Sequence, residues 1–464
     1  MAQLREDDTI AAVATPPGEG GISMIRVSGP RALECLQRLF HPFAKDAPKS
    51  FPTHTAQAGW ICGPEGEKID QAVVTFFRAP NSYTGEDTAE ICGHGGLKVT
   101  RKILEAVLAA ESRLAEPGEF TRRAFLNGKM DLTQAEAVLD LIRAKSDLSA
   151  RAALGQLEGT LSAKLRSIKE RLMRVYAHME AFLDFPEEDI EVYSDLTFAE
   201  LFGVLEKELR DLAESFRRGA LIREGLSCVI AGRPNAGKSS LFNALLARDR
   251  ALVSEYPGTT RDSLEETVEI GGLALRLVDT AGLGHDAHHP LDRIGMERTL
   301  QALEGSQLVL FVIDGSVPLE HNDQTVFDQA VLGRPFLVVL NKSDCPRRAD
   351  PEAIYKMTGT RAGIEVSAAA RSGLDALETA IRTKIEESGL SHESEQITRL
   401  RHKSAVDRSA QSLQRARRAF EAREPLDLIS ADVRDAVDQL AELVGEIYSE
   451  DLLDVIFSEF CIGK

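Results

Sequence analysis

The segment from Gly232 to Ser239, with the sequence GRPNAGKS, contains residue types that bind the phosphate groups of a nucleotide. In a loop of this spacing, glycines let backbone N–H groups approach phosphate oxygens, a lysine adds positive charge and a hydroxyl binds Mg²⁺. Lys238 and Ser239 occupy the lysine and hydroxyl positions. The predicted nucleotide contacts in this loop are Asn235, Ala236, Gly237, Lys238, Ser239 and Ser240.

Two later segments have the composition of switches that sense the third phosphate. The first contains GTTRD at 258–262, where Thr260 is a second predicted Mg²⁺ ligand beside Ser239. The second, LRLVDTAG at 275–282, reads as a strand that brings Asp279 towards the metal and the Gly282 amide towards the γ-phosphate. The contacts predicted from these segments are Ser254, Glu255, Tyr256, Pro257, Gly258, Thr259, Thr260, Asp279, Thr280, Ala281 and Gly282.

Asp344, in the sequence NKSD at 341–344, is the predicted determinant of base identity. A carboxylate there can accept hydrogen bonds from the ring N–H and the exocyclic amine of guanine, whereas adenine has neither donor in that geometry. The sequence therefore predicts binding of GTP rather than ATP. The base contacts expected from this motif and from the later sequence IEVSAA are Asn341, Lys342, Asp344, Ser367, Ala368 and Ala369.

Short apolar runs at 226–230, 308–313 and 336–340 read as strands that position these motifs. Continuous apolar runs are typical of a parallel sheet covered by helices on both faces. Residues 240–246 follow the phosphate-binding loop and read as a helix. The expected fold of this region is therefore an α/β P-loop domain.

The remaining sequence predicts a multidomain protein, because 464 residues exceed one ordinary core. The first 125 residues mix strand-like runs with glycine turns, which indicates an α+β domain, whereas 130–222 and 388–456 have helical periodicity. The boundaries that we predict are 1–125 for the N-terminal domain, 126–222 and 387–464 for two halves of one all-α domain, and 223–386 for a GTPase domain inserted between them.

The composition limits the classes of partner. A net charge of −18 argues against a protein that coats nucleic acid, and no DNA partner is expected. A basic run between Arg399 and Arg423 is either a solvated face with compensating acids or a stripe that faces RNA. Apolar runs are too short for a membrane span and the start lacks a signal pattern, so we expect no membrane partner and a cytoplasmic location.

Several further segments resemble one family. Together with the nucleotide motifs, the chain is similar from end to end to the bacterial tRNA-modification GTPases of the MnmE (TrmE) family, K⁺-dependent GTPases of the TrmE-Era-like class. The segments that resemble it are TPPG at 15–18, NSYTGED at 81–87, GHGG at 93–96, PGEF at 117–120 and FCIGK at 460–464.

This resemblance implies a folate-binding, dimer-forming N-terminal domain, a discontinuous helical domain and an inserted GTPase domain. It implies a homodimer that joins the FAD-dependent flavoprotein MnmG (GidA) in a heterotetramer-type complex, with FAD on that partner only. The implied reaction adds an aminomethyl or carboxymethylaminomethyl group to carbon five of the wobble uridine of tRNA. The implied one-carbon donor is a folate, either 5,10-methylenetetrahydrofolate or 5-formyltetrahydrofolate. The positions that match the family's folate contacts are Arg26, Glu90, Lys129 and Lys464.

Hydrolysis in such a protein needs a group that orients water. Leu283 stands where Ras-like enzymes place a glutamine, and its aliphatic side chain has no polar group for that task. The resemblance implies a carboxylate just before the triplet RIG at 293–295, where this sequence has Asp292 in place of the family's glutamate. Asp286 and Glu297 are the alternatives, and a structural role for Asp292 is a further one.

The resemblance also implies that K⁺ replaces an arginine finger between the β- and γ-phosphates. Its expected ligands are Asn235, Ser254, Tyr256 and Thr259. The predicted catalytic set is Asp292, Asn235 and Lys238. The alternative function is a GTP-switched RNA-binding or ribosome-assembly factor, which would have no use for a one-carbon donor.

Overall fold

The computed structural model describes residues 8–43, 51–184, 195–249, 265–279, 303–361, 363–387 and 396–464. Contacts group the chain into two compact units, each of which is described by itself. The first unit comprises 1–139, 165–178 and 433–464, and the second comprises 140–164 and 179–432. The domain boundaries expected at 125, 222 and 386 stay a prediction.

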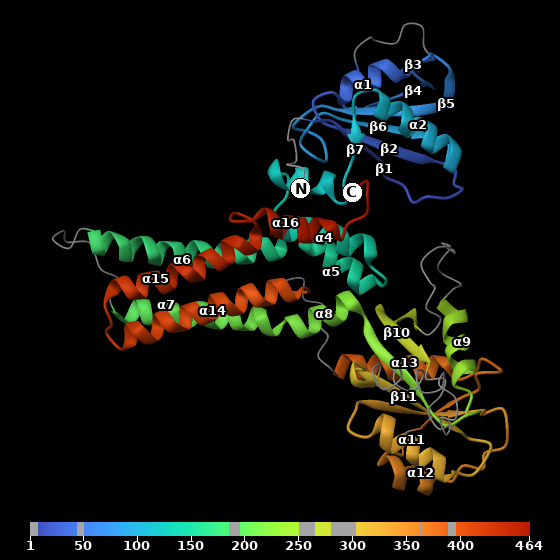
Figure 1. The fold of residues 1–464 in the computed structure, drawn as a ribbon. Coiled ribbons are helices and arrows are strands. Elements are labelled where there is room, and N and C mark those ends of the chain that lie inside the picture. Colours follow the sequence, from blue (N-terminus) through green and yellow to red (C-terminus); the bar gives the residue numbers. More distant parts are fainter. Residues whose placement is uncertain are drawn as a thin grey trace, which may run out of the picture. The chain divides into compact units, whose positions relative to one another are not determined.

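The first unit contains a seven-stranded sheet in the order β3-β4-β5-β6-β2-β1-β7 (Figure 1). Neighbouring strands are antiparallel except β1 and β7, which are parallel. The strands are β1 (Ile10–Val13), β2 (Ser23–Ser28), β3 (Phe40–Pro42), β4 (Thr55–Cys62), β5 (Lys68–Phe77), β6 (Thr88–Gly93) and β7 (Arg113–Leu114).

Helices α1 (Ala32–Leu39) and α2 (Leu97–Ala109) pack on one face of this sheet. Alternate strand residues such as Ile25 and Ile91 enter the shared core, because successive side chains of a strand point to opposite faces. The intervening residues of these strands point to the other face, and Arg26 of β2 and Glu90 of β6 are among them. The expected α+β fold of this region is confirmed.

The end of the chain packs against the start of this unit. Helix α16 (Glu450–Ser458) lies beside α3 (Glu119–Leu126), and Asp454 accepts a 2.7 Å hydrogen bond from Arg122. Gly463 follows with φ +100°, and a Cβ there would lie 2.3 Å from the Val13 carbonyl oxygen. A side chain at position 463 would therefore collide with β1, and glycine allows the tail to approach this strand.

The second unit contains a six-stranded sheet in the order β13-β12-β11-β8-β10-β9, parallel except for the antiparallel strand β9. The three apolar runs become β8, β11 and β12, which confirms the predicted strands. The strands are β8 (Leu226–Ala231), β9 (Glu265–Ile270), β10 (Leu273–Asp279), β11 (Leu308–Asp314), β12 (Phe336–Asn341) and β13 (Gly363–Val366).

Helices cover both faces of this sheet, as the apolar strands predict. One core joins Cys228 and Ile230 to α9 (Lys238–Asp249) and α13 (Leu374–Glu387). The other core joins Val229 and Ala231 to the opposite layer. That layer consists of α11 (His321–Val326), the π-helical turn η1 (Phe327–Val331) and α12 (Pro351–Thr358).

The two stretches with helical periodicity form helices that pack together. Within the second unit, α7 lies along α14, and Arg417 forms a 3.0 Å ion pair with the buried Glu206. Gln156 also donates a 3.1 Å hydrogen bond to Thr398. The helices are α4 (Leu132–Arg143), α5 (Asp147–Leu157), α6 (Thr160–Asp184), α7 (Asp195–Glu214), α8 (Phe216–Glu224), α14 (Leu400–Glu421) and α15 (Leu426–Val444).

Several cations of the basic run are paired with acids in the second unit. Arg399 lies 2.7 Å from Asp140, and Arg415 lies 2.8 Å from Asp432. These pairs favour the interpretation as a charge-compensated face over a stripe that faces RNA. Among the described helices, none combines the length and apolarity needed to cross a membrane.

Candidate nucleotide site and N-terminal polar site

The loop between β8 and α9 has the conformation of a phosphate cradle. Asn235 is exposed and has φ +62°, and Gly237 has φ +92°. A Cβ on Gly237 would lie 2.1 Å from the side-chain nitrogen of Asn341. Both the backbone angle and the available space therefore require glycine at this position.

Lys238 lies at the start of α9 and is 8% exposed. Its Nζ donates hydrogen bonds to the carbonyls of Gly232 at 2.9 Å and Arg233 at 3.1 Å, so the ammonium is held inside the loop. Ser239 and Ser240 are exposed in the first turn of the helix. Because the first N–H groups of a helix have no carbonyl partner within it, this end of α9 favours anions.

Asn341 connects two predicted parts of the site. Its Nδ2 donates a 2.9 Å hydrogen bond to the Ala236 carbonyl, and its Oδ1 accepts a 3.1 Å bond from the Ala368 amide. The residue is 2% exposed, so the amide is fixed on both sides. Asn341 thereby holds the phosphate-binding loop and the loop after β13 in one arrangement.

Asp344 is exposed at the same edge and is oriented by Ser367. The buried Ser367 hydroxyl donates a 2.5 Å hydrogen bond to Asp344 Oδ1 and accepts one from the Ala370 amide at 3.0 Å. The bond from Ser367 lowers the pKa of Asp344. The carboxylate is therefore ionised at neutral pH, with acceptor capacity left for a base. Ala368 is buried in this loop and Ala369 is exposed.

These groups meet beyond the carboxyl ends of β8, β12 and β13, where open parallel sheets bind ligands. Lys342 follows β12 with φ +62°, and its ammonium lies 2.6 Å from Asp314 at the end of β11. Asp314 was not among the site residues predicted from the sequence, and neither were the other carboxylates beside Arg233. The signal that indicates Asp314 is the one shared by the other site residues, a polar residue at the end of an apolar strand.

The other predicted nucleotide and catalytic residues lie outside the described ranges. Asp279 is the last residue of β10, and its side chain is not among those described. The water-orienting and potassium-binding roles therefore stay predictions. The residues concerned are Ser254, Glu255, Tyr256, Pro257, Gly258, Thr259, Thr260, Thr280, Ala281, Gly282 and Asp292, with the alternatives Asp286 and Glu297.

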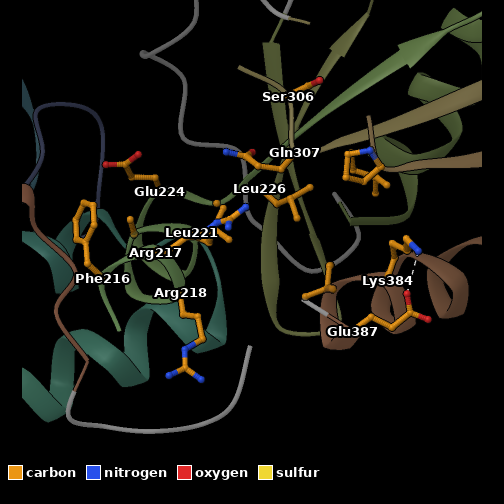
Figure 2. A pocket seen from close by; sticks show the side chains of 15 residues that line it. Phe216, Arg217, Arg218, Leu221, Glu224, Leu226, Ser306, Gln307, Lys384 and Glu387 are labelled. Atoms are coloured by element: carbon orange, nitrogen blue, oxygen red, sulfur yellow. Dashed lines mark hydrogen bonds and ion pairs between the residues drawn. The ribbon is translucent and has the colours of Figure 1, made fainter. Parts of the chain in front are cut away.

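A cleft of about 750 Å³ lies at the amino-terminal ends of the strands of this sheet (Figure 2). Its lining includes Leu226 and Leu308, at the amino-terminal ends of β8 and β11, together with Arg217, Arg218 and Lys384. The phosphate-binding loop follows the opposite end of β8. The cleft is thus distinct from the predicted nucleotide site.

Arg26 and Glu90 face one another across β2 and β6 in the first unit. Two nitrogens of Arg26 donate to Glu90 Oε1 at 2.8 and 3.1 Å, and the guanidinium lies 5.0 Å from the Tyr83 ring and 5.8 Å from the Phe120 ring. Arg26 is 8% exposed, and its third nitrogen, Nη1, has no hydrogen-bond partner among the described residues. A buried donor without a partner is costly, and a ligand acceptor would remove that cost.

Lys464 belongs to the same group. Burial lowers the pKa of its ammonium, the nearby charge of Arg26 lowers it further, and Glu90 acts in the opposite direction. The structure therefore brings three of the four predicted folate contacts together. Lys129 is exposed and instead donates a 3.0 Å hydrogen bond to the Pro80 carbonyl.

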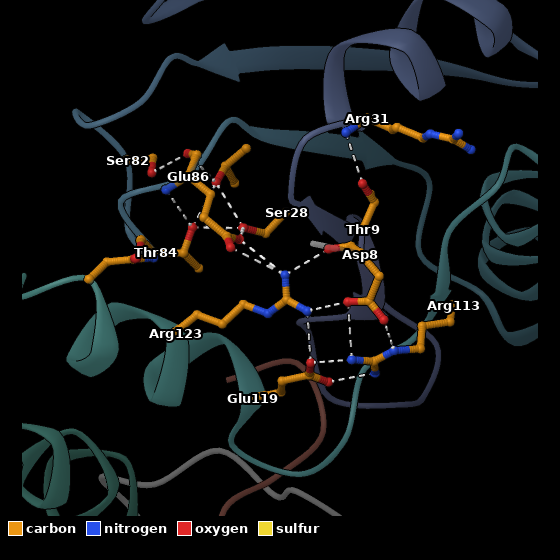
Figure 3. Close-up of polar contacts among 12 residues, drawn as sticks. Asp8, Thr9, Ser28, Arg31, Ser82, Thr84, Glu86, Arg113, Glu119 and Arg123 are labelled. Atoms are coloured by element: carbon orange, nitrogen blue, oxygen red, sulfur yellow. Dashed lines mark hydrogen bonds and ion pairs between the residues drawn. The ribbon is translucent and has the colours of Figure 1, made fainter. Parts of the chain in front are cut away.

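A separate charged network lies in the same unit (Figure 3). Arg123 donates to Asp8 at 2.6 Å and to Glu119 at 2.9 Å, and Arg113 donates to the same two carboxylates at 2.5 Å. Burial opposes ionisation of Asp8 and Glu119, but the hydrogen bonds from the arginines outweigh it and lower the pKa of each carboxyl. The two arginines and the two carboxylates are hydrogen-bonded to one another, so we interpret the network as a structural feature of the fold.

Comparisons with known proteins match both ends of the chain. Sequence models for the GTP-binding protein TrmE N-terminus and for the MnmE helical domain match residues 9–129 and 132–461. The tRNA modification GTPase MnmE of Thermoanaerobacter pseudethanolicus is 42% identical over 98% of this chain and 99% of its own. The proteins of that name from Heliobacterium modesticaldum and Clostridioides difficile are 44% and 40% identical, over 98% and 99% of this chain and 99% of each relative.

Proposed function

Because this chain belongs to the tRNA modification GTPase family MnmE, we propose that it hydrolyses GTP to drive modification of carbon five of the wobble uridine in tRNA. The observation that supports the nucleotide part best is the Asn341 side chain, which joins the phosphate-binding loop to the loop that orients Asp344. The similarity also extends through the first unit. An assembly factor that only switches with GTP is therefore the weaker alternative.

The described residues fit a bound guanine nucleotide. Gly237 leaves room for phosphate oxygens that a Cβ would occupy, Lys238 supplies positive charge, and the oriented Asp344 accepts from the guanine edge. The Ser239 hydroxyl at the start of α9 suits Mg²⁺, with Thr260 as the proposed second ligand. When bound, Mg²⁺ neutralises negative charge on the phosphates.

For hydrolysis we keep Asp292 as the residue that orients water. Asn235 is exposed in the phosphate-binding loop and is therefore accessible to a cation, and Ser254, Tyr256 and Thr259 are the other proposed ligands. When bound, K⁺ supplies the positive charge that an arginine finger would otherwise provide.

The polar group around Arg26 fits a folate. Its buried Nη1 lacks an acceptor, and the Tyr83 and Phe120 rings fix the guanidinium. We propose that Arg26, Lys464 and Lys129 hold folate carboxylates and that Glu90 accepts hydrogen bonds from the pterin amine. The proposed folate is 5,10-methylenetetrahydrofolate or 5-formyltetrahydrofolate, and when bound it would supply one carbon unit.

The proposed assembly is a cytoplasmic homodimer that works with the FAD-dependent flavoprotein MnmG on tRNA. Family membership supports these partners. The flavin stays on the partner, and the modified group is aminomethyl or carboxymethylaminomethyl.

The decisive experiment is mass analysis of wobble uridine after the full chain is mixed with MnmG, tRNA, the folate, GTP, K⁺ and either ammonium or glycine as the source of the nitrogen. We expect the modified nucleoside in the complete mixture and none when GTP or the folate is omitted. Replacing K⁺ with Na⁺ should slow GTP hydrolysis while nucleotide binding stays intact. Modification without folate would contradict the proposed donor, and equal hydrolysis in both salts would contradict the proposed cation site.

A further inference from the structure

Asp314 lies between the two halves of the nucleotide site and has no role in the proposed function above. It ends β11 and is 6% exposed. One carboxylate oxygen accepts from the Ser316 amide at 3.0 Å and the Ser316 hydroxyl at 2.6 Å. The other accepts from Lys342 Nζ at 2.6 Å. The side chain is thus fixed from two directions.

The second oxygen also lies 3.8 Å from a terminal nitrogen of Arg233, within the phosphate-binding loop. Arg233 is bordered by two further carboxylates, Glu320 at 3.4 Å and Asp323 at 3.5 Å. The Arg233 guanidinium therefore lies among three carboxylates, at the end of β11 and the start of α11. One oxygen of Asp314 therefore interacts with two cations: Arg233 in the phosphate-binding loop and Lys342 in the base-binding motif.

Lys342 stands between Asn341 and Asp344 but has a partly exposed side chain. When the ammonium of a lysine is held, its four methylene groups form a defined apolar surface. Such a surface suits the flat face of a purine. Without an anchor, the same side chain would occupy many rotamers and would lose more entropy on binding.

We infer that Asp314 is a positioning residue for guanine-nucleotide binding, which anchors Lys342 beside the base and relates it to the phosphate-binding loop through Arg233. This inference rests on the proposed function. Burial opposes ionisation of Asp314, but hydrogen bonds from Lys342 and Ser316 outweigh it and lower the pKa of the carboxyl. Asp314 is therefore charged at neutral pH, as an anchor for an ammonium group must be.

The test is a double-mutant cycle on the affinity of the full chain for a fluorescent GDP analogue. Asp314→Asn removes the charge at nearly constant shape, and Lys342→Met removes the ammonium but keeps an apolar stem. We expect each change to weaken binding about tenfold and the double variant to match Lys342→Met, because both changes break one interaction. Independent structural effects would multiply to about a hundredfold and would overturn the inference.

Asp350→Asn is the matched control, since Asp350 caps α12 in the same unit and asparagine caps a helix equally well. Its affinity should equal that of the unmodified chain. If Asp314→Asn does not fold, as its thermal denaturation would reveal, Ser316→Ala decides: it removes the 2.6 Å hydrogen bond that fixes Asp314 and should weaken GDP binding about threefold while the protein stays folded. An unchanged affinity of Ser316→Ala overturns the inference. An unmodified chain that binds no GDP would instead overturn the proposed function.

Discussion

At the scale of single residues, the nucleotide site depends on contacts between segments that are far apart in the sequence. Asn341 bonds to Ala236 and Ala368, and the Asn341 nitrogen fills the space beside Gly237. Each predicted motif therefore needs the other motifs for its shape. A change in the phosphate-binding loop is expected to disturb base recognition as well.

Gly237→Ala should weaken GDP binding by at least about a hundredfold, because the new methyl group collides with Asn341 and φ is positive. The measurement is fluorescence titration with a GDP analogue. Gly359→Ala is a suitable control, since Gly359 has φ +72° and open space around its Cβ position. The control should lose a little stability and keep its affinity. Equal affinity losses in both variants would refute the steric explanation.

Sequence alone predicted the residues that act through local order, such as Lys238 and Asp344. Their positions follow from the strand that precedes each of them. The contact between Lys342 and Asp314 was missed because it joins side chains from neighbouring strands of the folded sheet. The group around Arg26 was predicted only by resemblance, since the register that pairs Arg26 with Glu90 is not visible in either segment.

At the scale of elements, the first unit is held together by charges as well as by its apolar core. Arg123 on α3 and Arg113 on β7 share Asp8 and Glu119. Glu119 is 2% exposed, so loss of a partner would leave a charge buried. The network fixes α3 beside the sheet edge formed by β1 and β7.

Arg123→Met should lower the free energy of unfolding of the first unit by about 3 kcal/mol at pH 7, because it breaks a buried ion-pair network. The pKa values of Asp8 and Glu119 are lower in the folded protein than in the unfolded chain, where they are about 4. The stabilisation from the network is therefore fully present above about pH 4, and it is lost as the pH falls through the folded-state pKa values. The difference between variant and unmodified chain should therefore shrink below about pH 4.

Urea unfolding followed by tryptophan fluorescence can measure this change in the free energy of unfolding, because the signal comes from the first unit. The only tryptophan in the sequence is Trp60, which lies on β4. Arg101→Met is the control, because Arg101 is 80% exposed and its pair with Glu105 should contribute less than about 1 kcal/mol. A difference between the Arg123 variant and the unmodified chain that is independent of pH would argue against the network.

The sequence predicted elements well where apolar residues were continuous and less well where they were mixed. Strands β8, β11 and β12 are buried on both faces and have continuous apolar runs, which are easy to recognise. In the first unit the strand-like runs were mixed with glycine turns, and β4, for example, has three exposed residues among its eight. Exposed residues on a strand weaken the periodic signal.

At the scale of the whole molecule, the two proposed ligand sites lie in different units. Arg26, Glu90 and Lys464 belong to the first unit, and the phosphate-binding loop belongs to the second. Each unit has its own buried core. The binding of each ligand should therefore tolerate damage to the other site.

Lys464→Met should weaken 5-formyltetrahydrofolate binding by about tenfold or more, because it removes a charged partner for the folate carboxylates. The GDP affinity of the same variant should stay within about twofold. Calorimetric titration with both ligands, on this variant and on Gly237→Ala, provides the crossed comparison. Lys464→Arg should keep most folate affinity. A variant in which both affinities fall would show that the sites are energetically coupled.

The approach of Gly463 to the Val13 carbonyl has a consequence for biosynthesis. Gly463 is 450 positions after Val13 in the sequence (463 − 13), so during synthesis β1 can meet this glycine only after the intervening chain has been made. During that interval the nascent N-terminal sheet lacks part of its native surroundings, while the intervening GTP-binding region has time to fold behind it. Docking of residues 460–464 would then be a late step in the maturation of the first unit, and a chain interrupted before Lys464 would keep the proposed nucleotide site but lack this residue of the proposed folate site.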